Sequence, residues 1–169
     1  GIAMQAYLRS GDDDARRIID WTKRTGRQVT VRLVKGAYWD FETIHAEQQG
    51  WPTPVWSRKI DTDACFERMT KLFIEGMPKR AGERGVKLAL GSHNVRSIAN
   101  ALALLKKNGL PESAIELQML HGMADQLKEA AADRIHDHGP DSLRVSGLDH
   151  QPVRNVEHVV GGEHYLAPV

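Results

Sequence analysis

Short apolar runs alternate along the chain with longer segments in which apolar residues recur at helical spacing. The short runs predict strands at residues 2–8, 28–34, 86–90 and 115–120, with one more strand at 142–145. The longer segments predict helices at residues 12–25, 40–49, 62–76, 95–108 and 124–135. Strands that alternate with helices in this way are typical of βα units around a parallel sheet, so the expected fold class is α/β.

Residues with known preferences for helix ends mark some of these boundaries. The three aspartates at 12–14 suit the positive end of the first helix dipole, and Gly26 is placed to end that helix. Thr62 or Asp63 is expected to cap the third helix.

Polar side chains gather where the predicted strands end. In strand order they are Gln5, then Arg32 with Lys35, then His93 with Asn94, and finally Gln118 with His121. Polar groups at the C-terminal ends of several successive strands are what the active site of a (β/α)8 barrel requires. An open doubly wound sheet instead concentrates its ligand groups at one switch point.

A complete barrel takes about 200 to 250 residues, so the 169-residue chain predicts an incomplete (β/α)8 TIM-type barrel. The barrel segment is expected at residues 1–135. Residues 136–169 are rich in His and Gly and lack clear periodicity. They are expected to form a divergent or disordered tail with at most one last strand.

The stretch RLVKGAYWD at residues 32–40 places two cations, Arg32 and Lys35, within and at the end of a strand that otherwise reads as buried. A buried guanidinium without a partner is very costly, so the sequence should supply, or bind, a negative group. Two interpretations stay open. Either these cations face an anionic ligand, or Arg32 pairs with Glu116 or another carboxylate purely as structure.

Strand alternation groups the polar residues by face. Arg32 shares a face with Val34, and Gln118 shares one with Glu116 and Leu120. If these faces look inward, the mouth of the barrel holds amide and guanidinium donors around a mostly apolar wall, from Gln5, Arg32, Gln118 and Leu120. Such a set suits a flat, polar-edged, partly anionic ligand.

Composition and motifs exclude several classes of function. Lys plus Arg total 23 and Asp plus Glu total 22, so the formal net charge is +1, and no basic tract indicates a nucleic-acid partner. The eight His residues show no HxxxH or HExxH spacing, so no metal site is expected. The GxGxxG, GxxxxGK[ST] and GxSxG motifs are absent, so the usual signals for a nucleotide-binding loop and for the nucleophile turn of a hydrolase are missing. The single Cys65 fits a reducing compartment and is expected to be a small buried residue in a helix.

The ends of the chain add one expectation. No apolar run approaches the roughly 18 to 20 residues that span a bilayer, and no signal-peptide pattern is present. The chain starts with GIAMQAYL, which lacks an initiator Met and is strand-like from its first residue. A piece of a longer protein is therefore expected.

Five blocks in this order and spacing resemble proline dehydrogenase: GIAMQAYL, VRLVKGAYWD, WSRKIDTD, GSHN and LQMLHGM. The resemblance runs from Gly1 to about Asp133. It is greatest to the proline dehydrogenase domain of bacterial proline utilisation A, a bifunctional flavoenzyme. RLVKGAYWD is the most specific of the blocks.

The resemblance implies a flavin-binding barrel that oxidises L-proline to Δ1-pyrroline-5-carboxylate in proline catabolism toward glutamate. A hydride passes to FAD, and the reduced flavin passes its electrons to membrane quinone. The resemblance also implies a cytoplasmic protein whose full-length form associates peripherally with the inner face of the membrane.

The resemblance also assigns site residues. Arg32 would lie near the flavin N5, where a cation favours the reduced flavin, and Tyr38 and Leu120 would wall the proline site beside it. The residues implied to contact the cofactor are Gln5, Arg32, Val34, Gly36, Ala37, Trp39, Ser57, Lys59, Thr62, His93, Asn94 and Gln118.

Other parts of the family pattern are missing. The family's substrate-site lysine and aspartate precede GIAMQAYL, and its YLVRRLLE block, whose arginines clamp the proline carboxylate, has no counterpart here. The isolated chain is therefore not expected to close a barrel or to oxidise proline. Two hypotheses remain open. The chain is the flavin-binding fragment of a proline dehydrogenase, or it is a non-catalytic remnant or interaction domain that retains the half-barrel scaffold.

Overall fold

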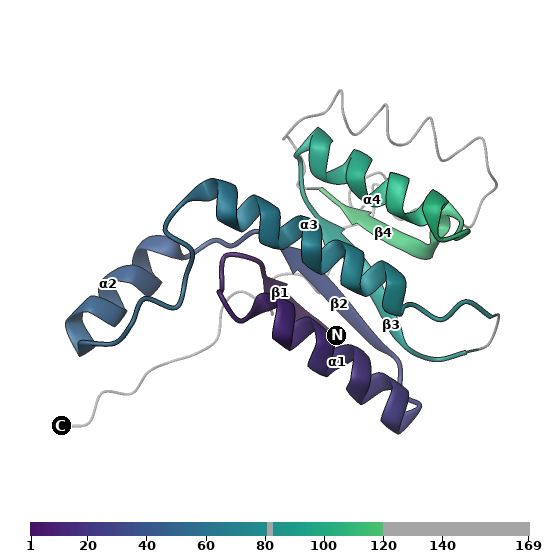
Figure 1. Ribbon diagram of the computed structural model, residues 1–169, viewed down its shortest axis with the longest axis horizontal. Coiled ribbons are helices and arrows are strands. Elements are labelled where there is room, and N and C mark those ends of the chain that lie inside the picture. The colour runs from purple at the N-terminus through teal and green to yellow at the C-terminus, as the bar shows by residue number, and fades with distance from the viewer. Residues whose placement is uncertain (81–82, 120–169) are drawn as a thin grey trace, which may run out of the picture.

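The computed structural model describes residues 1–80 and 83–119, which form a four-stranded parallel sheet with its helices (Figure 1). The strands are β1 (Ile2–Gln5), β2 (Val29–Val34), β3 (Val86–Gly91) and β4 (Ile115–Gln118). The helices are α1 (Gly11–Thr25), α2 (Trp39–Gln49), α3 (Lys59–Gly76), α4 (Val95–Lys107) and the short 3-10 helix η1 (Glu112–Ala114). The expected helix at 124–135, strand at 142–145 and tail at 136–169 lie outside the described residues.

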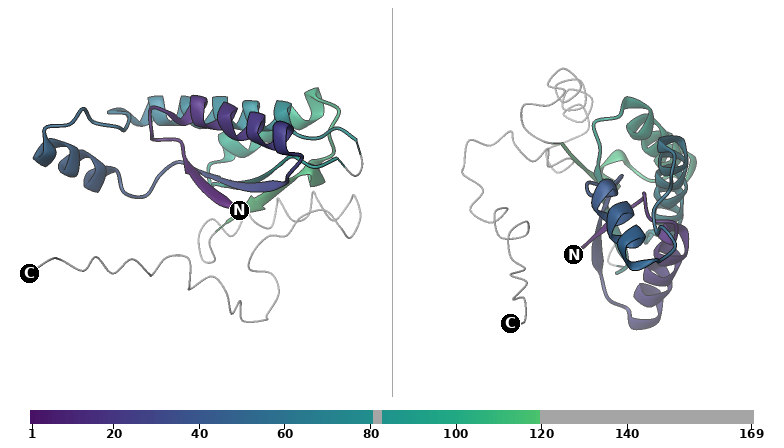
Figure 2. Two further views of the ribbon diagram at one scale, coloured as in Figure 1. Left: turned by 90° about the horizontal axis from the view of Figure 1, so that it is seen from below. Right: turned by 90° about the vertical axis from the view of Figure 1, so that its left-hand side faces the viewer.

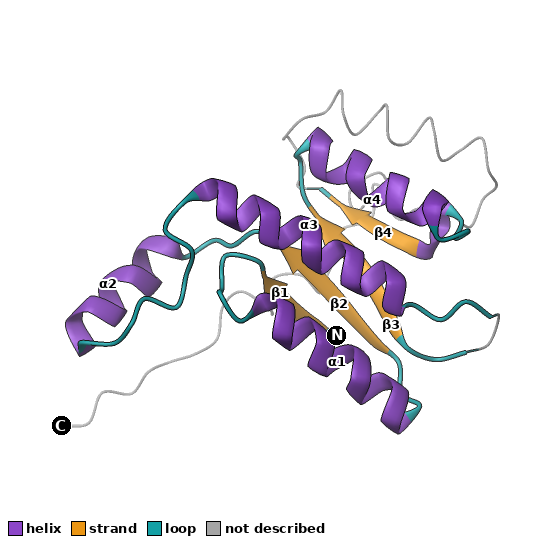
Figure 3. Ribbon diagram, in the orientation of Figure 1, coloured by secondary structure: helices purple, strands orange, loops and turns teal. Residues whose placement is uncertain are grey.

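The strands pair with their sequence neighbours, in the order β1-β2-β3-β4, and every pairing is parallel. Helices α1, α3 and α4 lie on the same face of this sheet, as Figures 2 and 3 show. A doubly wound sheet reverses its strand order and carries helices on both faces, whereas a barrel winds in one direction with all helices outside. The α/β class is confirmed, and the described part has the architecture of a partial TIM-type barrel.

The helix-facing side of the sheet carries the core. Its buried apolar strand residues are Met4, Val31, Leu33, Val86, Leu88, Leu90, Ile115 and Leu117. The central helix α3 contributes Phe66, Met69 and Phe73, each fully buried. Cys65 on the same helix is also fully buried, as expected for a small apolar residue, and burial raises the pKa of its thiol. Alternation along the strands, rather than uniform apolarity, therefore builds this core.

The opposite side of the sheet is polar and contains small residues. In one row across the strands, Arg32 is paired with Ala3 on one side and Ala89 on the other, and Ala89 is paired with Glu116. No helix of the described ranges covers this side (Figure 2). In a barrel this face is the interior.

The helix boundaries follow the sequence signals at one site and depart from them at another. Gly26 ends α1 in the left-handed conformation at φ 63°, as expected. The expected cap of α3 at Thr62 or Asp63 is wrong, because the helix already begins at Lys59. Arg58, just before it, is extended and makes two hydrogen bonds to the Asp61 carboxylate, at 2.8 and 2.9 Å. Asp63 lies one turn into the helix, where its carboxylate is available to other partners.

We expect Phe73→Ala to lower the free energy of unfolding by about 3 to 5 kcal/mol, because it leaves a cavity in a core position that is fully buried. Phe41→Ala is the matched control, since that ring is 65% exposed and its loss should cost less than about 0.5 kcal/mol. Urea denaturation followed by circular dichroism measures both. Equal losses would mean that α3 is not central to the core.

Candidate functional site

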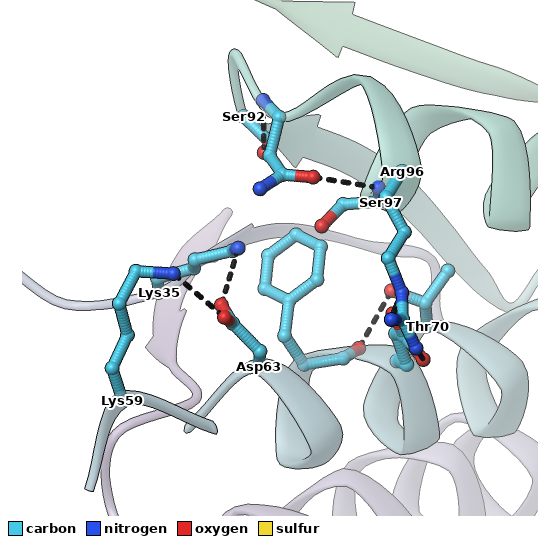
Figure 4. Close-up of polar contacts among 10 residues, drawn as sticks. Lys35, Lys59, Asp63, Thr70, Ser92, Arg96 and Ser97 are labelled. Atoms are coloured by element: carbon cyan, nitrogen blue, oxygen red, sulfur yellow. Dashed lines mark hydrogen bonds and ion pairs between the residues drawn. The ribbon is translucent and has the colours of Figure 1, made fainter. Parts of the chain in front are cut away.

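Lys35, directly after β2, has a partner supplied by the protein itself. Its ammonium donates to Oδ1 of Asp63, and Lys59 donates to Oδ2 of the same carboxylate at 2.7 Å (Figure 4). The Lys35 ammonium also lies 5.6 Å from the centre of the Phe66 ring. One carboxylate on α3 thus holds two lysines that come from different parts of the chain.

Arg32 is in a different situation. It is exposed, so the expectation of a buried guanidinium is wrong, because no described element covers its side of the sheet. It makes no hydrogen bond or ion pair with any other residue of the described ranges, and Glu116 instead accepts from Nε2 of Gln118 at 3.0 Å. The alternative of a purely structural ion pair with Glu116 is therefore not realised among these residues.

Small residues leave room around Arg32. Its neighbours in the row across the sheet are Ala3 and Ala89. A Cβ atom added at Gly91 would lie 3.7 Å from the Arg32 Nε and 2.9 Å from the Val34 Cγ1. The guanidinium side chain therefore reaches toward β3, across a part of the sheet where side chains are small or absent.

The loop between β2 and α2 is fixed from beneath by Tyr7. Gly36 has φ 140°, and a Cβ there would lie 2.5 Å from the Tyr7 ring, so only glycine fits. Tyr7 is 2% exposed, and its hydroxyl donates to Oε1 of Glu42 in α2 at 3.4 Å. Burial, helped by that carboxylate, raises the pKa of Tyr7. The N–H of Ala37 in the same loop donates to Oε1 of Gln5 at 3.3 Å.

The aromatic residues of this loop are presented rather than buried. Tyr38 is 57% exposed and Trp39 is 41% exposed. The indole N–H of Trp39 donates to the carbonyl of Trp56 at 2.7 Å, which ties the loop to the segment before α3. Of the residues that the resemblance implies to contact the cofactor, Gln5 and Ala37 thus meet beyond the carboxyl ends of β1 and β2. Gly36 is next to Ala37 in the chain, and Trp39 begins α2.

A cavity of about 460 Å³ lies between the N-terminal parts of α3 and α4. Charged and polar side chains line much of it: Lys35, Lys59, Asp63, Glu67, Asn94, Arg96 and Ser97 (Figure 4). Arg96 pairs with Glu67 across the two helices at 2.8 Å. Asn94 caps α4 by accepting from the Ser97 N–H at 3.1 Å, and Ser92 accepts from the Asn94 N–H.

Lys59 and Asn94, which the resemblance implies to contact the cofactor, both line this cavity, whereas Asp63, Glu67 and Arg96 were not among the predicted site residues. A signal was present on α3, because residues 59, 63 and 67 recur every four positions and so share one helix face. The opposing charge on α4 could not be read from that spacing.

Other predicted site residues lie elsewhere. Thr62 is 9% exposed and does not line the cavity, while Ser57 is exposed in the loop before α3. His93 is half-buried in the loop after β3. Leu120 and His121 lie outside the described residues.

The electrostatics of Asp63 follow from its two partners. Burial raises the pKa of its carboxyl, but the hydrogen bonds and charges of Lys35 and Lys59 outweigh that effect and leave the pKa below its ordinary value. Asp63 is therefore ionised at neutral pH.

Within residues 1–80 and 83–119 no cluster of His, Cys, Asp or Glu is arranged to hold a metal ion. None of the helices in these ranges has the length and apolar character that a bilayer crossing needs.

Comparison with known proteins gives a consistent result. A family model described as proline dehydrogenase matches residues 1–147, which extends past residue 135, the expected end of the barrel segment. The bifunctional protein PutA of Rhizobium meliloti is 34% identical over 138 residues, which are 79% of this chain and 10% of that protein. Mitochondrial proline dehydrogenase 2 of Arabidopsis thaliana is 27% identical over 130 residues, or 73% of this chain and 26% of that protein.

A solved structure supports the same relationship. Proline utilization A from Bdellovibrio bacteriovorus, inactivated by N-propargylglycine, superposes with a TM-score of 0.73 at 41% identity, over 79% of this chain and 13% of that one. The chain thus spans about a tenth of the length of the bifunctional relatives that it matches.

We expect Gly36→Ala to lower the free energy of unfolding by about 2 to 4 kcal/mol, because a methyl group there both meets the Tyr7 ring and strains the backbone. Gly50→Ala is the matched control. Gly50 also has a positive φ, of 67°, but has open space around its Cβ position, so its cost should be about 1 kcal/mol. Thermal unfolding of both variants measures the difference. If the two losses are the same, the Tyr7 ring does not fix the loop.

Proposed function

The chain belongs to the proline dehydrogenase family, and we propose that it forms the flavin-binding part of an enzyme that oxidises L-proline to Δ1-pyrroline-5-carboxylate. The proposed cofactor is FAD. The chain spans about a tenth of the length of its bifunctional relatives. Proline oxidation is therefore proposed for an enzyme of which this chain forms one part.

The observation that carries the proposal is the exposed guanidinium of Arg32. It lies on the interior-type face of the sheet, without a partner among the described residues, beside the small residues Ala3 and Ala89. A cation in such a position suits a ligand that is flat and becomes electron-rich. The residues present therefore fit a flavin ring.

Two amides at the same end of the sheet add hydrogen-bonding capacity. Toward the described residues, Gln5 uses its carbonyl oxygen and Gln118 uses its NH2 group. The NH2 group of Gln5 also interacts with the Tyr7 hydroxyl. Because an NH2 group carries two N–H donors, it and the carbonyl oxygen of Gln118 can both still bind a ligand. A flavin ring presents both acceptors and donors along its polar edge, so the two amides complement it.

The roles of the chain's own residues follow from this arrangement. FAD, when bound, supplies the acceptor for the hydride of the substrate. Arg32 would supply positive charge next to the ring, while Gln5 and Gln118 would orient its edge. Tyr38 would shield the substrate side from water, which strengthens the electrostatic effect of Arg32.

The rest of the proposal rests on the family alone. It includes quinone as the electron acceptor and a cytoplasmic location with peripheral attachment to the inner face of the membrane. A non-catalytic remnant or interaction domain is the competing function, and flavin binding separates the two.

We expect Arg32→Met to lower the midpoint potential of FAD bound to the purified chain by about 30 mV, because the electron-rich reduced flavin loses about 1.4 kcal/mol of charge stabilisation that the oxidised flavin does not receive. Lys87→Met is the matched control. Lys87 is an exposed cation on the same face of the sheet, but near the amino end of β3. Spectroelectrochemistry measures the potential, and flavin fluorescence titration shows whether the chain binds FAD. An unchanged potential in Arg32→Met would remove Arg32 from the site, and a chain that binds no flavin would favour the competing function.

We also expect the purified chain, supplied with FAD and L-proline, not to reduce an artificial electron-accepting dye. The reason is that the arginine pair that clamps the proline carboxylate in the family has no counterpart in this sequence. Proline-dependent bleaching of the dye would contradict this expectation and would show that the chain completes a substrate site by itself.

A further inference from the structure

Two ammonium groups from different elements meet on a single carboxylate at the edge of the cavity between α3 and α4. Lys35 follows β2, whereas Lys59 and Asp63 lie one turn apart on α3 (Figure 4). The Asp63 side chain is 29% exposed. The ion pair is therefore partly shielded from water, which makes it stronger than a fully exposed one.

The two lysines depend on Asp63 to different degrees. The Lys35 side chain is 23% exposed, and its ammonium also lies near the Phe66 ring. The Lys59 side chain is 78% exposed, and Asp63 is its one ion-pair partner among the described residues. Without that carboxylate, a lysine so exposed would sample many rotamers in water.

The charges that line the cavity do not balance. Three cations, Lys35, Lys59 and Arg96, face two carboxylates, Asp63 and Glu67, which leaves a net charge of +1. Arg96 and Glu67 satisfy one another, so the excess lies with the two lysines. Each ammonium has three N–H donors and gives one of them to Asp63, which leaves donors for an anionic ligand.

We propose that Asp63 is a positioning residue that holds the ammonium groups of Lys35 and Lys59 together so that both bind one diphosphate group in this cavity. The inference rests on the proposed function, since the family resemblance implies that Lys59 contacts the cofactor and FAD contains a diphosphate group; what the inference adds is the role of Asp63. Holding flexible side chains in place before binding reduces the entropy that the ligand must overcome.

The two possible roles of Asp63 predict opposite changes in ligand affinity when its carboxylate is removed. A carboxylate beside an anion site repels the ligand, so if Asp63 acts only through its charge, its removal strengthens binding. If Asp63 acts by positioning the lysines, its removal weakens binding even though the cavity becomes more positive. A merely structural role would change stability and leave affinity for the diphosphate unaltered.

The test compares Asp63→Asn with Asp61→Asn, titrated with inorganic pyrophosphate, FAD and riboflavin. Asp61 lies on the same turn of α3, but it pairs with Arg58 and does not line the cavity. We expect Asp63→Asn to weaken pyrophosphate and FAD binding about tenfold, equivalent to about 1.4 kcal/mol. Riboflavin, which lacks phosphate, should bind unchanged, and Asp61→Asn should alter no affinity more than twofold.

A second variant tests the proposal independently, in case Asp63→Asn does not fold. Lys59→Gln changes a largely exposed side chain, so the chain should fold normally and lose pyrophosphate affinity to a similar extent. The double variant Lys59→Gln with Asp63→Asn should then lose less than the sum of the two single losses, because the residues act as a unit. Additive losses would overturn the proposal, as would unchanged or tighter pyrophosphate binding by Asp63→Asn.

The outcomes separate this inference from the flavin proposal. Pyrophosphate binding that depends on Asp63, without any binding of FAD or riboflavin, would retain the role of Asp63 and refute the flavin site. Riboflavin binding without pyrophosphate binding would support the flavin site and refute the role of Asp63.

Discussion

The alternation of side chains along β2 decides which of its residues face the helices and which face the open side of the sheet. Val31 and Leu33 point to the helices and are fully buried, so the residue between them must point to the other side of the sheet. That residue is Arg32. Because a shift of register by one residue would exchange these faces, the burial of two aliphatic side chains fixes the position of the guanidinium. The position of the guanidinium is thus a consequence of core packing.

Arg32 in β2 and Lys35 in the loop after it have different surroundings, and their positions relative to the end of the strand explain why. Arg32 lies on the uncovered side of the sheet and has no partner among the described residues. Lys35 comes after the strand has ended, where the chain is free to turn toward α3 and Asp63. In the proposed site, one cation faces the redox-active ring and the other, held by a carboxylate, faces the phosphate groups. A single short segment could therefore serve both ends of an elongated cofactor.

Close packing under the loop gives this segment its shape. The Tyr7 ring fills the space where a Cβ of residue 36 would be, and the side chains of Gln5 and Trp39 bind backbone groups on either side. A loop that is held by its neighbours keeps its side chains oriented before any ligand arrives.

The sequence by itself determined the types and order of the elements, the helix end at Gly26 and the common face of Gln5, Arg32 and Gln118. These features depend on period and on backbone preference, which act between residues close in sequence. Only the tertiary structure decided that Arg32 is exposed, that α3 begins at Lys59 and that Lys35 pairs with Asp63, 28 residues away. The ion pair between Arg96 on α4 and Glu67 on α3 could not be predicted from the sequence either. Such pairings depend on how helices cross over the sheet, because the distance between two side chains is set by packing and not by their separation along the chain.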